Sequence, residues 1–273
     1  MHGRCSPIDT VEGRFSGGWD ARSAEQLIGA LAPWSKRYFR WDVRGLDSFP
    51  SAGGALLVSN HSGGMMTADV LILASAFYSH FGYDRPLYTL GHDALFAGPL
   101  AHVMSQFGLI PADRQTAIDA LRTGGVVLVF PGGLHDAYRP TRQSNVIDFN
   151  GRTGYVKLAV DAGVPLVPAA SIGGQESQLF LTRGTWLAKR LGLSRFRADI
   201  LPLTIGIPFG LSAILPVNIP LPTKIVTDVL APVDIAGQFG DEPDVGEVDV
   251  HVRGLMQAAL GRLAGERRFP VLG

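Results

Sequence analysis

The run VVLVF, Val126–Phe130, constrains the fold of this chain more than any other segment. All five residues are apolar, four of them are β-branched or aromatic, and Pro131 closes the run. A strand that is apolar on both faces has to be covered on both sides, as strands are in parallel sheets between layers of helices. Apolar residues at helical spacing flank the run, at 116–122 and 154–162. The segment therefore predicts a buried strand of a largely parallel sheet.

Strand-like and helix-like segments alternate along the rest of the chain. The predicted strands lie at 54–59, 85–90, 126–130 and 165–170. The predicted helices lie at 24–41, 67–78 with Thr67 as N-cap, 96–106, 116–122, 154–162 and 248–263, and an acidic loop is expected at 236–246. This alternation predicts an α/β fold with a mostly parallel central sheet flanked by helices. We expect a flexible lead-in over residues 1–23 and a single domain over 24–273.

The composition and the missing motifs exclude several classes of function. Basic and acidic residues number 24 each, so the net charge of zero gives no general attraction to nucleic acid. The single cysteine, Cys5, excludes a disulfide within the chain and fits a reducing compartment. The sequence has no P-loop, no G-x-G-x-x-G, no G-x-S-x-G elbow and no H-E-x-x-H pair, so we expect no metal site. The N-terminus lacks an apolar segment, so we expect no signal peptide.

Two apolar segments bear on membrane contact. The longest charge-free run, Ile200–Thr223, is long enough to cross a membrane, but its five prolines are incompatible with a spanning helix. Its apolar residues belong either to buried strands and loops or to a surface that lies against lipid. Residues 179–197 combine aromatic residues and leucines with five basic residues. This pattern is typical of a segment in the lipid interface, and equally of an exposed basic helix packed on the core.

A histidine follows the predicted strand 54–59 without a break, in the stretch NHSGGMMTAD. Ligands of open α/β sheets bind at the carboxyl ends of strands, where a neutral imidazole can take a proton from a hydroxyl. Gly63 and Gly64 allow the chain to turn so that Asp69 reaches His61 and fixes its tautomer. The alternative is structural: His61 is a turn residue, and Asp69 adds a favourable charge at a helix N-terminus.

Two further blocks carry groups that suit an anion. In VFPGGLHDAYRP, backbone N–H groups of the Pro131–Gly133 turn can cradle an anion, and His135, Asp136 and Arg139 add polar side chains. In GLIPADR, Arg114 is a reasonable phosphate ligand at a loop exit. The alternatives are an ordinary strand-to-loop turn for the first block and a solvated surface arginine for the second.

The order and spacing of NHSGGMMTAD, GLIPADR, FPGGLHDAYRP and GVPLVPAAS resemble the PlsC-like glycerolipid acyltransferases of the lysophospholipid acyltransferase superfamily. The resemblance covers a motif core at residues 46–235, and its FPGG form is closer to the diacylglycerol acyltransferase-like branch. It implies an acyltransferase-like domain that moves a fatty acyl group from acyl-CoA to the hydroxyl of a glycerolipid or another lipid alcohol.

The resemblance also implies roles for particular residues. His61 is then the general base and Asp69 its orienting acid, with no metal and no cofactor besides acyl-CoA as substrate. The lipid acceptor implies peripheral or monotopic contact with the cytoplasmic face of a membrane. The implied substrate-binding residues are Asn60, Arg114, Pro131, Gly132, Gly133, His135 and Asp136.

Two departures from the family's motifs leave alternatives open. At the usual His-x4-Asp spacing the carboxylate position holds Met66, and Asp69 lies three residues later. Either the glycine loop absorbs the additional residues and Asp69 pairs with His61, which we favour, or another acid serves, or the pair is incomplete. An incomplete pair implies a catalytically impaired lipid-binding protein that retains the fold. In the branch's Pro-Gly-Gly-x-Arg-Glu pattern, His135 and Asp136 occupy the last two places, which weakens charge-based phosphate binding there.

Overall fold

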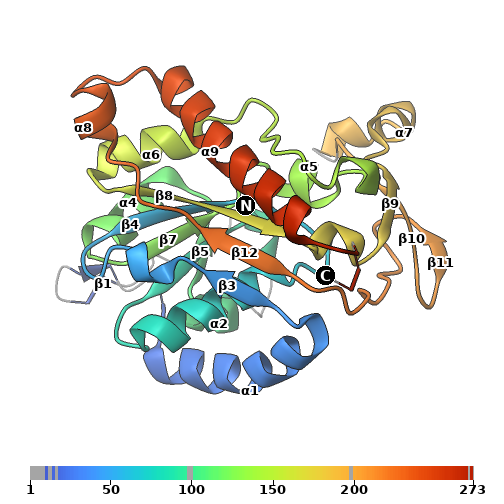
Figure 1. Cartoon of the computed structure of the whole chain (residues 1–273), viewed down its shortest axis with the longest axis horizontal. Helices are drawn as coiled ribbons and strands as arrows, with labels where there is room; N and C mark the ends of the chain where they lie inside the picture. Colours follow the sequence, from blue (N-terminus) through green and yellow to red (C-terminus); the bar gives the residue numbers. More distant parts are fainter. Residues whose placement is uncertain are drawn as a thin grey trace, which may run out of the picture.

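A seven-stranded sheet forms the centre of the molecule (Figure 1). The computed structural model describes residues 10–11, 14–15, 18–96, 101–196, 199–269 and 271–272. The strand order is β3-β12-β8-β4-β7-β5-β6, and every neighbouring pair is parallel except β12 with β8. The strands are β3 (Asp42–Arg44), β4 (Ala55–Ser59), β5 (Leu87–Gly91), β6 (Leu109–Pro111), β7 (Val126–Val129), β8 (Leu166–Ile172) and β12 (Val226–Val229). The predicted α/β fold with a mostly parallel sheet is confirmed.

Helices cover both faces of this sheet, which explains why its central strands are apolar throughout. One layer consists of α1 (Ala21–Phe39) and α2 (Asp69–Phe81), and the other of α4 (Arg114–Arg122), α6 (Gly154–Ala162) and α9 (Val245–Glu266) (Figure 1). In β4, Ala55 and Leu57 pack toward the first layer, whereas Leu56 and Val58 pack toward the second. Side chains of successive strand residues point to opposite faces, so a fully buried strand needs apolar residues at every position.

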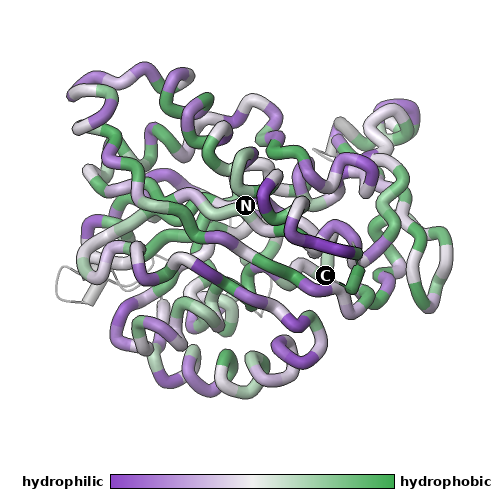
Figure 2. Tube along the Cα trace, viewed as in Figure 1, coloured by the Kyte–Doolittle hydropathy of each residue, from purple (hydrophilic) through white to green (hydrophobic). Residues whose placement is uncertain are grey.

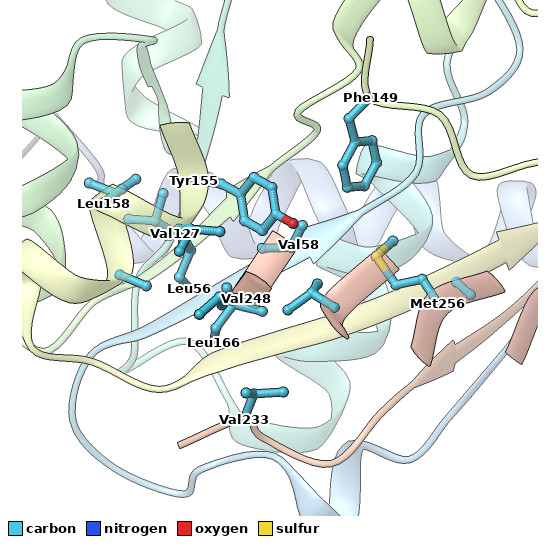
Figure 3. Close-up of a cluster of buried hydrophobic side chains, with 14 of the residues drawn as sticks. Leu56, Val58, Val127, Phe149, Tyr155, Leu158, Leu166, Val233, Val248 and Met256 are labelled. Carbon is cyan, nitrogen blue, oxygen red and sulfur yellow. The ribbon is translucent and has the colours of Figure 1, made fainter. Parts of the chain in front are cut away.

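Figure 3 shows the core on the second face. Leu56, Val58 and Val127 of the central strands meet Tyr155 and Leu158 of α6, and Val248 and Met256 of α9 complete the layer. The Tyr155 hydroxyl donates to Asp249 Oδ1 at 2.8 Å, so the polar end of this buried ring is satisfied. The two helices are therefore tied to each other as well as to the sheet.

Smaller elements surround this framework. The remaining helices are α3 (Ala101–Gln106), α5 (Gly133–Ala137), α7 (Thr185–Arg190) and α8 (Ile235–Phe239), and short 3₁₀ turns lie at Leu46–Ser48, Asp93–Phe96, Thr141–Gln143, Gly174–Glu176 and Leu193–Phe196. A second, antiparallel sheet has the order β11-β10-β9, from β9 (Leu179–Thr182), β10 (Leu203–Gly206) and β11 (Gly210–Ser212). A two-stranded pair joins β1 (Thr10–Val11) to β2 (Arg14–Phe15). The small three-stranded sheet stands at the right edge of Figure 1.

Several sequence predictions about these elements were wrong. Thr67 does not cap α2: the helix begins at Asp69, and its N-cap Ala68 makes no side-chain capping bond, because the preceding loop is needed to return Asp69 to the strand end. The expected loop at 236–246 contains helix α8 at its start, capped by Asp234. Residues 179–196, the described part of the basic segment, do not form one helix but β9, α7 and a 3₁₀ turn.

Two expectations concern segments that the structure covers in part. Most of the 1–23 lead-in, and residues 97–100 of the helix predicted at 96–106, lie outside the described residues; α1 already begins at Ala21. Within the described part of the chain, no helix combines the length and apolar character that crossing a membrane requires.

Candidate active site

His61 lies two residues after the end of β4, the central strand, at the carboxyl edge of the parallel sheet. Its Nδ1 is 2.9 Å from Asp69 Oδ2, and the same oxygen accepts the backbone N–H of Ser62 at 2.9 Å. The Asp69 side chain is 1% exposed and the His61 side chain 16% exposed. His61 Nε2 makes no hydrogen bond to the residues that the structure describes. One ring nitrogen is thus held by a buried carboxylate while the other is left to accept a proton.

The glycine loop makes this pair possible despite the unusual spacing. Gly63 and Gly64 have φ angles of 88° and 65°, in the left-handed region that glycine adopts at little cost. A Cβ on Gly64 would stand 2.9 Å from the Phe180 ring, so the loop lies close to the small sheet. Met66, at the motif's usual carboxylate position, is 50% exposed. The loop bends outward at the additional residues and returns Asp69 to His61.

A second buried carboxylate supports the backbone of His61. Asp136 Oδ2 accepts the His61 N–H at 2.6 Å, and Asp136 Oδ1 pairs with Arg139. Both side chains are almost completely buried. Burial, together with repulsion from Arg183, lowers the pKa of Arg139 to about 10. Asp136 therefore faces the protein interior, and its contacts fix the main chain at His61.

Two neighbours fix the direction of the His61 ring and the strand end beneath it. The ring of Phe130, which follows β7, stacks on the imidazole with a centroid separation of 4.3 Å and an interplanar angle of 30°. Asn60 is buried: its Nδ2 donates to the Ser171 carbonyl at 2.9 Å, and its Oδ1 accepts the Ser171 N–H at 2.7 Å. Asn60 thus extends the pairing of β4 with β8 by one residue and locks the backbone from which His61 projects.

The Phe-Pro-Gly-Gly turn is bound within the chain. The Gly133 N–H donates to the Phe130 carbonyl at 3.0 Å, and Arg152 Nη1 donates to the Pro131 and Gly132 carbonyls at 3.3 and 3.0 Å. A Cβ on Gly132 would collide with the Asp136 side chain, so glycine lets Asp136 reach His61. The turn serves here as a support for His61, and the Gly133 amide is already in use.

His135 and Arg114 point to partners other than His61. His135 Nε2 lies 3.1 Å from Asp148 Oδ2. Burial raises the pKa of Asp148, but the Asn150 N–H, His135 and Arg183 outweigh it and hold that pKa below its ordinary value.

Arg114 is 60% exposed and pairs with Asp161, at the end of α6 that leads into the amino end of β8. Arg114 follows β6, which lies three strands from β4 at the edge of the sheet. The structure thus gathers Asn60, His61, Asp69, Asp136 and the Pro131–Gly133 turn, and places His135 and Arg114 elsewhere.

Sequence reasoning missed two participants. Phe130 was assigned only as a strand residue, although its place directly after a strand parallel to β4 was a usable signal for a contact with His61. Arg152 lies well beyond the motif block, and no pattern around it indicated a contact with the turn.

An α/β sheet with a His–Asp pair after its central strand and a Phe-Pro-Gly-Gly turn beside it defines the acyltransferase class that the motifs resembled. The model of the Acyltransferase family matches residues 40–172, which hold His61, Asp69 and the turn. Nearly half of the chain thus matches the Acyltransferase family, and the chain is similar to PlsC-like acyltransferases and to their diacylglycerol acyltransferase-like branch.

One named group of relatives agrees with this similarity, and a solved acyltransferase structure shares the fold. An uncharacterized protein of Mycobacterium leprae is 31% identical over 238 residues, covering 85% of this chain and 62% of that protein. The "DGAT1/2-independent enzyme synthesizing storage lipids" of Bos taurus is 26% identical over 217 residues, covering 78% of this chain and 62% of that protein. The structure of the 1-acyl-sn-glycerophosphate (LPA) acyltransferase PlsC of Thermotoga maritima shares the fold, with a TM-score of 0.54, 17% identity, and coverage of 89% of this chain and 82% of that one. The chain spans less than two thirds of the length of the curated relatives it matches.

Proposed function

We propose that this chain transfers a fatty acyl group from acyl-CoA to the hydroxyl of a glycerolipid or another lipid alcohol. The observation that carries the proposal is the His61–Asp69 contact of 2.9 Å at the strand end, with Nε2 directed away from it. No further cofactor and no metal take part in the proposed reaction. Because the acceptor is a lipid and the donor a CoA thioester, we place the reaction at the cytoplasmic face of a membrane.

The reaction follows from the two ring nitrogens of His61. Nε2 takes the proton of the acceptor hydroxyl while its oxygen attacks the thioester carbonyl. The tetrahedral intermediate then expels the CoA thiolate, which receives the proton back from the imidazolium, so an ester and free CoA result. Asp69 keeps the remaining proton on Nδ1 and stabilises the imidazolium that forms in between. A buried carboxylate is well suited to this role because little water screens its charge.

The predicted substrate-binding residues take two kinds of role in this proposal. Asn60, Asp136 and the Pro131–Gly133 turn position His61 through the contacts described above. Arg152 is exposed next to the same turn and is the cation we assign to the phosphates of acyl-CoA. Arg114 and His135 stay predictions as ligands, since each already has an acidic partner.

The second candidate is a lipid-binding protein that keeps the fold without catalysis. Met66 at the motif position was the feature in its favour, and the contact of Asp69 with His61 weighs against it. A transfer assay with acyl-CoA and dispersed lipid acceptors separates the two functions.

His61→Ala is expected to lower the rate by about 10²–10⁴-fold while the protein stays folded, because it removes the general base. His80→Ala, in α2 and partly exposed, is the matched control and is expected to keep the wild-type rate. Equal rates for the wild type and His61→Ala contradict the mechanism. A wild-type protein that binds lipid but transfers nothing supports the second candidate.

A further inference from the structure

The small sheet β9-β10-β11 presents apolar side chains outward. Leu179 and Leu181 of β9, Ile205 of β10 and Leu211 of β11 are 41–65% exposed. Their neighbours along the strands, Phe180, Thr204 and Ser212, face inward and are buried. An antiparallel sheet with one solvated face ordinarily alternates apolar residues inside with polar residues outside. In this sheet the outward residues are apolar, while two of the three inward residues, Thr204 and Ser212, are polar.

The outward residues form one continuous surface. Ile205 lies directly opposite Leu179 on one side and Leu211 on the other, so the three side chains stand in a row. Around the β10–β11 turn the surface continues with Ile207 and Phe209, which are 63% and 54% exposed. Leu215 and Ile219, 73% and 59% exposed, follow in the loop. This part of the chain is largely green in the hydropathy colouring of Figure 2.

The inner face is satisfied by contacts within the sheet and with Asn218 and Tyr138 beside it. Thr204 Oγ1 lies 3.1 Å from Ser212 Oγ, and Asn218 Nδ2 donates to the same Ser212 oxygen at 2.9 Å. Phe180 packs edge-on against Tyr138, with ring centroids 6.0 Å apart. The polar groups of this sheet are thus used inside, and its outward face has aliphatic and aromatic side chains without polar anchors among them.

Positive charge accompanies this surface. From residue 177 to residue 227 the sequence has six basic residues and one acidic residue, in a chain whose net charge is zero. Lys189, Arg190 and Arg195, which lie between β9 and β10, are exposed. An apolar surface next to exposed cations is complementary to a bilayer with anionic headgroups, where aliphatic side chains enter the acyl region and cations meet phosphates.

The surface is joined to the candidate active site through one loop. Gly64, three residues after His61, lies against the Phe180 ring of β9. Met65 lines a small cleft together with Thr204 of β10 and with Asn218. The small sheet is therefore connected to His61 through a loop segment of only a few residues.

We propose that the outward face of β9, β10 and β11, with the loop to Ile219, docks on the surface of an anionic lipid bilayer. The inference rests on the proposed function, because an enzyme that acylates a membrane lipid needs its base close to the bilayer. Docking through this sheet holds the His61 loop, which contacts Phe180 on the inner side of the sheet, near the bilayer. The partner is the lipid surface itself, and a second copy of the chain or another protein is the competing occupant.

Sedimentation with vesicles of equal parts phosphatidylcholine and phosphatidylglycerol tests the proposal. The variant Phe209→Ser/Leu211→Ser is expected to bind at least about tenfold more weakly than wild type, because two large apolar side chains no longer enter the acyl region. The control Trp34→Gln/Val250→Thr removes side chains that are 57% and 63% exposed on α1 and α9, and is expected to bind like wild type. Circular dichroism and thermal unfolding verify the fold of each variant.

Four outcomes overturn the docking surface. They are a wild type that does not sediment with vesicles, a Phe209→Ser/Leu211→Ser variant that sediments equally, a control that binds as weakly as that variant, and a wild-type dimer that the variant converts to a monomer. If the first variant does not fold, Leu215→Ser/Ile219→Ser, outside the strands, replaces it under the same criteria.

The assay also keeps docking separate from catalysis. Vesicle binding is measured without acyl-CoA, so its result is valid even if the protein transfers no acyl group. If the protein both docks on vesicles and transfers acyl groups, the Phe209→Ser/Leu211→Ser variant is expected to lose more transfer activity with vesicle-bound acceptors than with short-chain acceptors dispersed in water. An equal loss with both acceptors contradicts a docking role.

Discussion

Asp69 binds His61 Nδ1 and the Ser62 N–H through a single oxygen, so its charge serves both the imidazole and the loop. Asp69→Asn is expected to lower the rate of acyl transfer by about 10²–10⁴-fold, because an amide cannot stabilise an imidazolium. The free energy of unfolding is expected to fall by about 1–2 kcal/mol, since an amide oxygen still accepts a hydrogen bond. Steady-state kinetics and urea unfolding measure the two effects.

Asp113→Asn is the matched control for this prediction. Asp113 caps α4 through a bond from the Thr116 N–H, and asparagine is as good an N-cap as aspartate. This control is expected to change neither rate nor stability appreciably. If Asp69→Asn behaves like the control, Asp69 is a helix-terminus charge and not a partner of the base.

At the level of single residues, the sequence carried the information for His61 and Asp69 but not for Arg114. Asp69 is the only carboxylate in 58–79, so a short loop could bring no other local acid to His61. Asp136, in contrast, meets His61 from 75 residues away because β4 and β7 are parallel neighbours whose carboxyl ends coincide. Arg114 pairs with Asp161, a contact between two helices that no local pattern announces.

Among the connecting elements, the loop 61–68 has two consecutive glycines with left-handed φ angles, Gly63 and Gly64. Gly64→Ala is expected to destabilise the protein by about 1–2 kcal/mol, the cost of a left-handed conformation for alanine. It is also expected to lower the rate of acyl transfer, because the new methyl group pushes the loop from Phe180 and Tyr138 and so disturbs His61. Thermal unfolding and kcat report the two effects.

The control Gly53→Ala separates the effect of backbone strain from the effect of the loop displacement expected in Gly64→Ala. Gly53 also has a left-handed φ, 76°, but a Cβ there meets no atom within 4 Å. The control is expected to lose similar stability and to keep its kcat. If both variants keep kcat, the contact of Gly64 with the two rings does not position His61.

Helices and strands were predictable where their apolar periodicity was strong, and not where the fold turns the apolar residues outward. The strands β4, β7 and β8 and helix α6 follow directly from apolar runs and helical spacing. The small sheet did not, because its apolar residues lie outside and mimic the pattern of a buried segment. Helix α8 is short and lies in an acidic stretch, so its capping by Asp234 is the main local signal for it.

For the molecule as a whole, Asp136 ties the end of β4 to α5, because it accepts the His61 N–H and also pairs with the buried Arg139. Asp136→Asn keeps an acceptor for the His61 N–H but leaves the Arg139 cation, 1% exposed, without its nearest counter-charge. The free energy of unfolding is expected to fall by about 3–5 kcal/mol, the usual cost of breaking a buried ion pair from one side. Urea unfolding monitored by circular dichroism measures it.

The double variant Asp136→Asn/Arg139→Met tests the cause of that loss. Replacing the guanidinium by an apolar side chain of similar length removes the unpaired charge, so the double variant is expected to be more stable than Asp136→Asn alone. If the double variant is less stable than Asp136→Asn, the loss of stability comes from packing and not from the unpaired charge.

The outward bend at Met66 has a consequence for how such chains are recognised. A search pattern that demands a carboxylate five residues after the histidine rejects this sequence, although the same two side chains meet in space. The number of residues between His61 and Asp69 can vary because the glycines let additional residues bulge outward while both side chains keep their positions. A signature written as a histidine, a glycine-bearing spacer of variable length and an acid that opens the next helix would retain such proteins. The members that it still missed would show how long the spacer can become before the two side chains no longer meet.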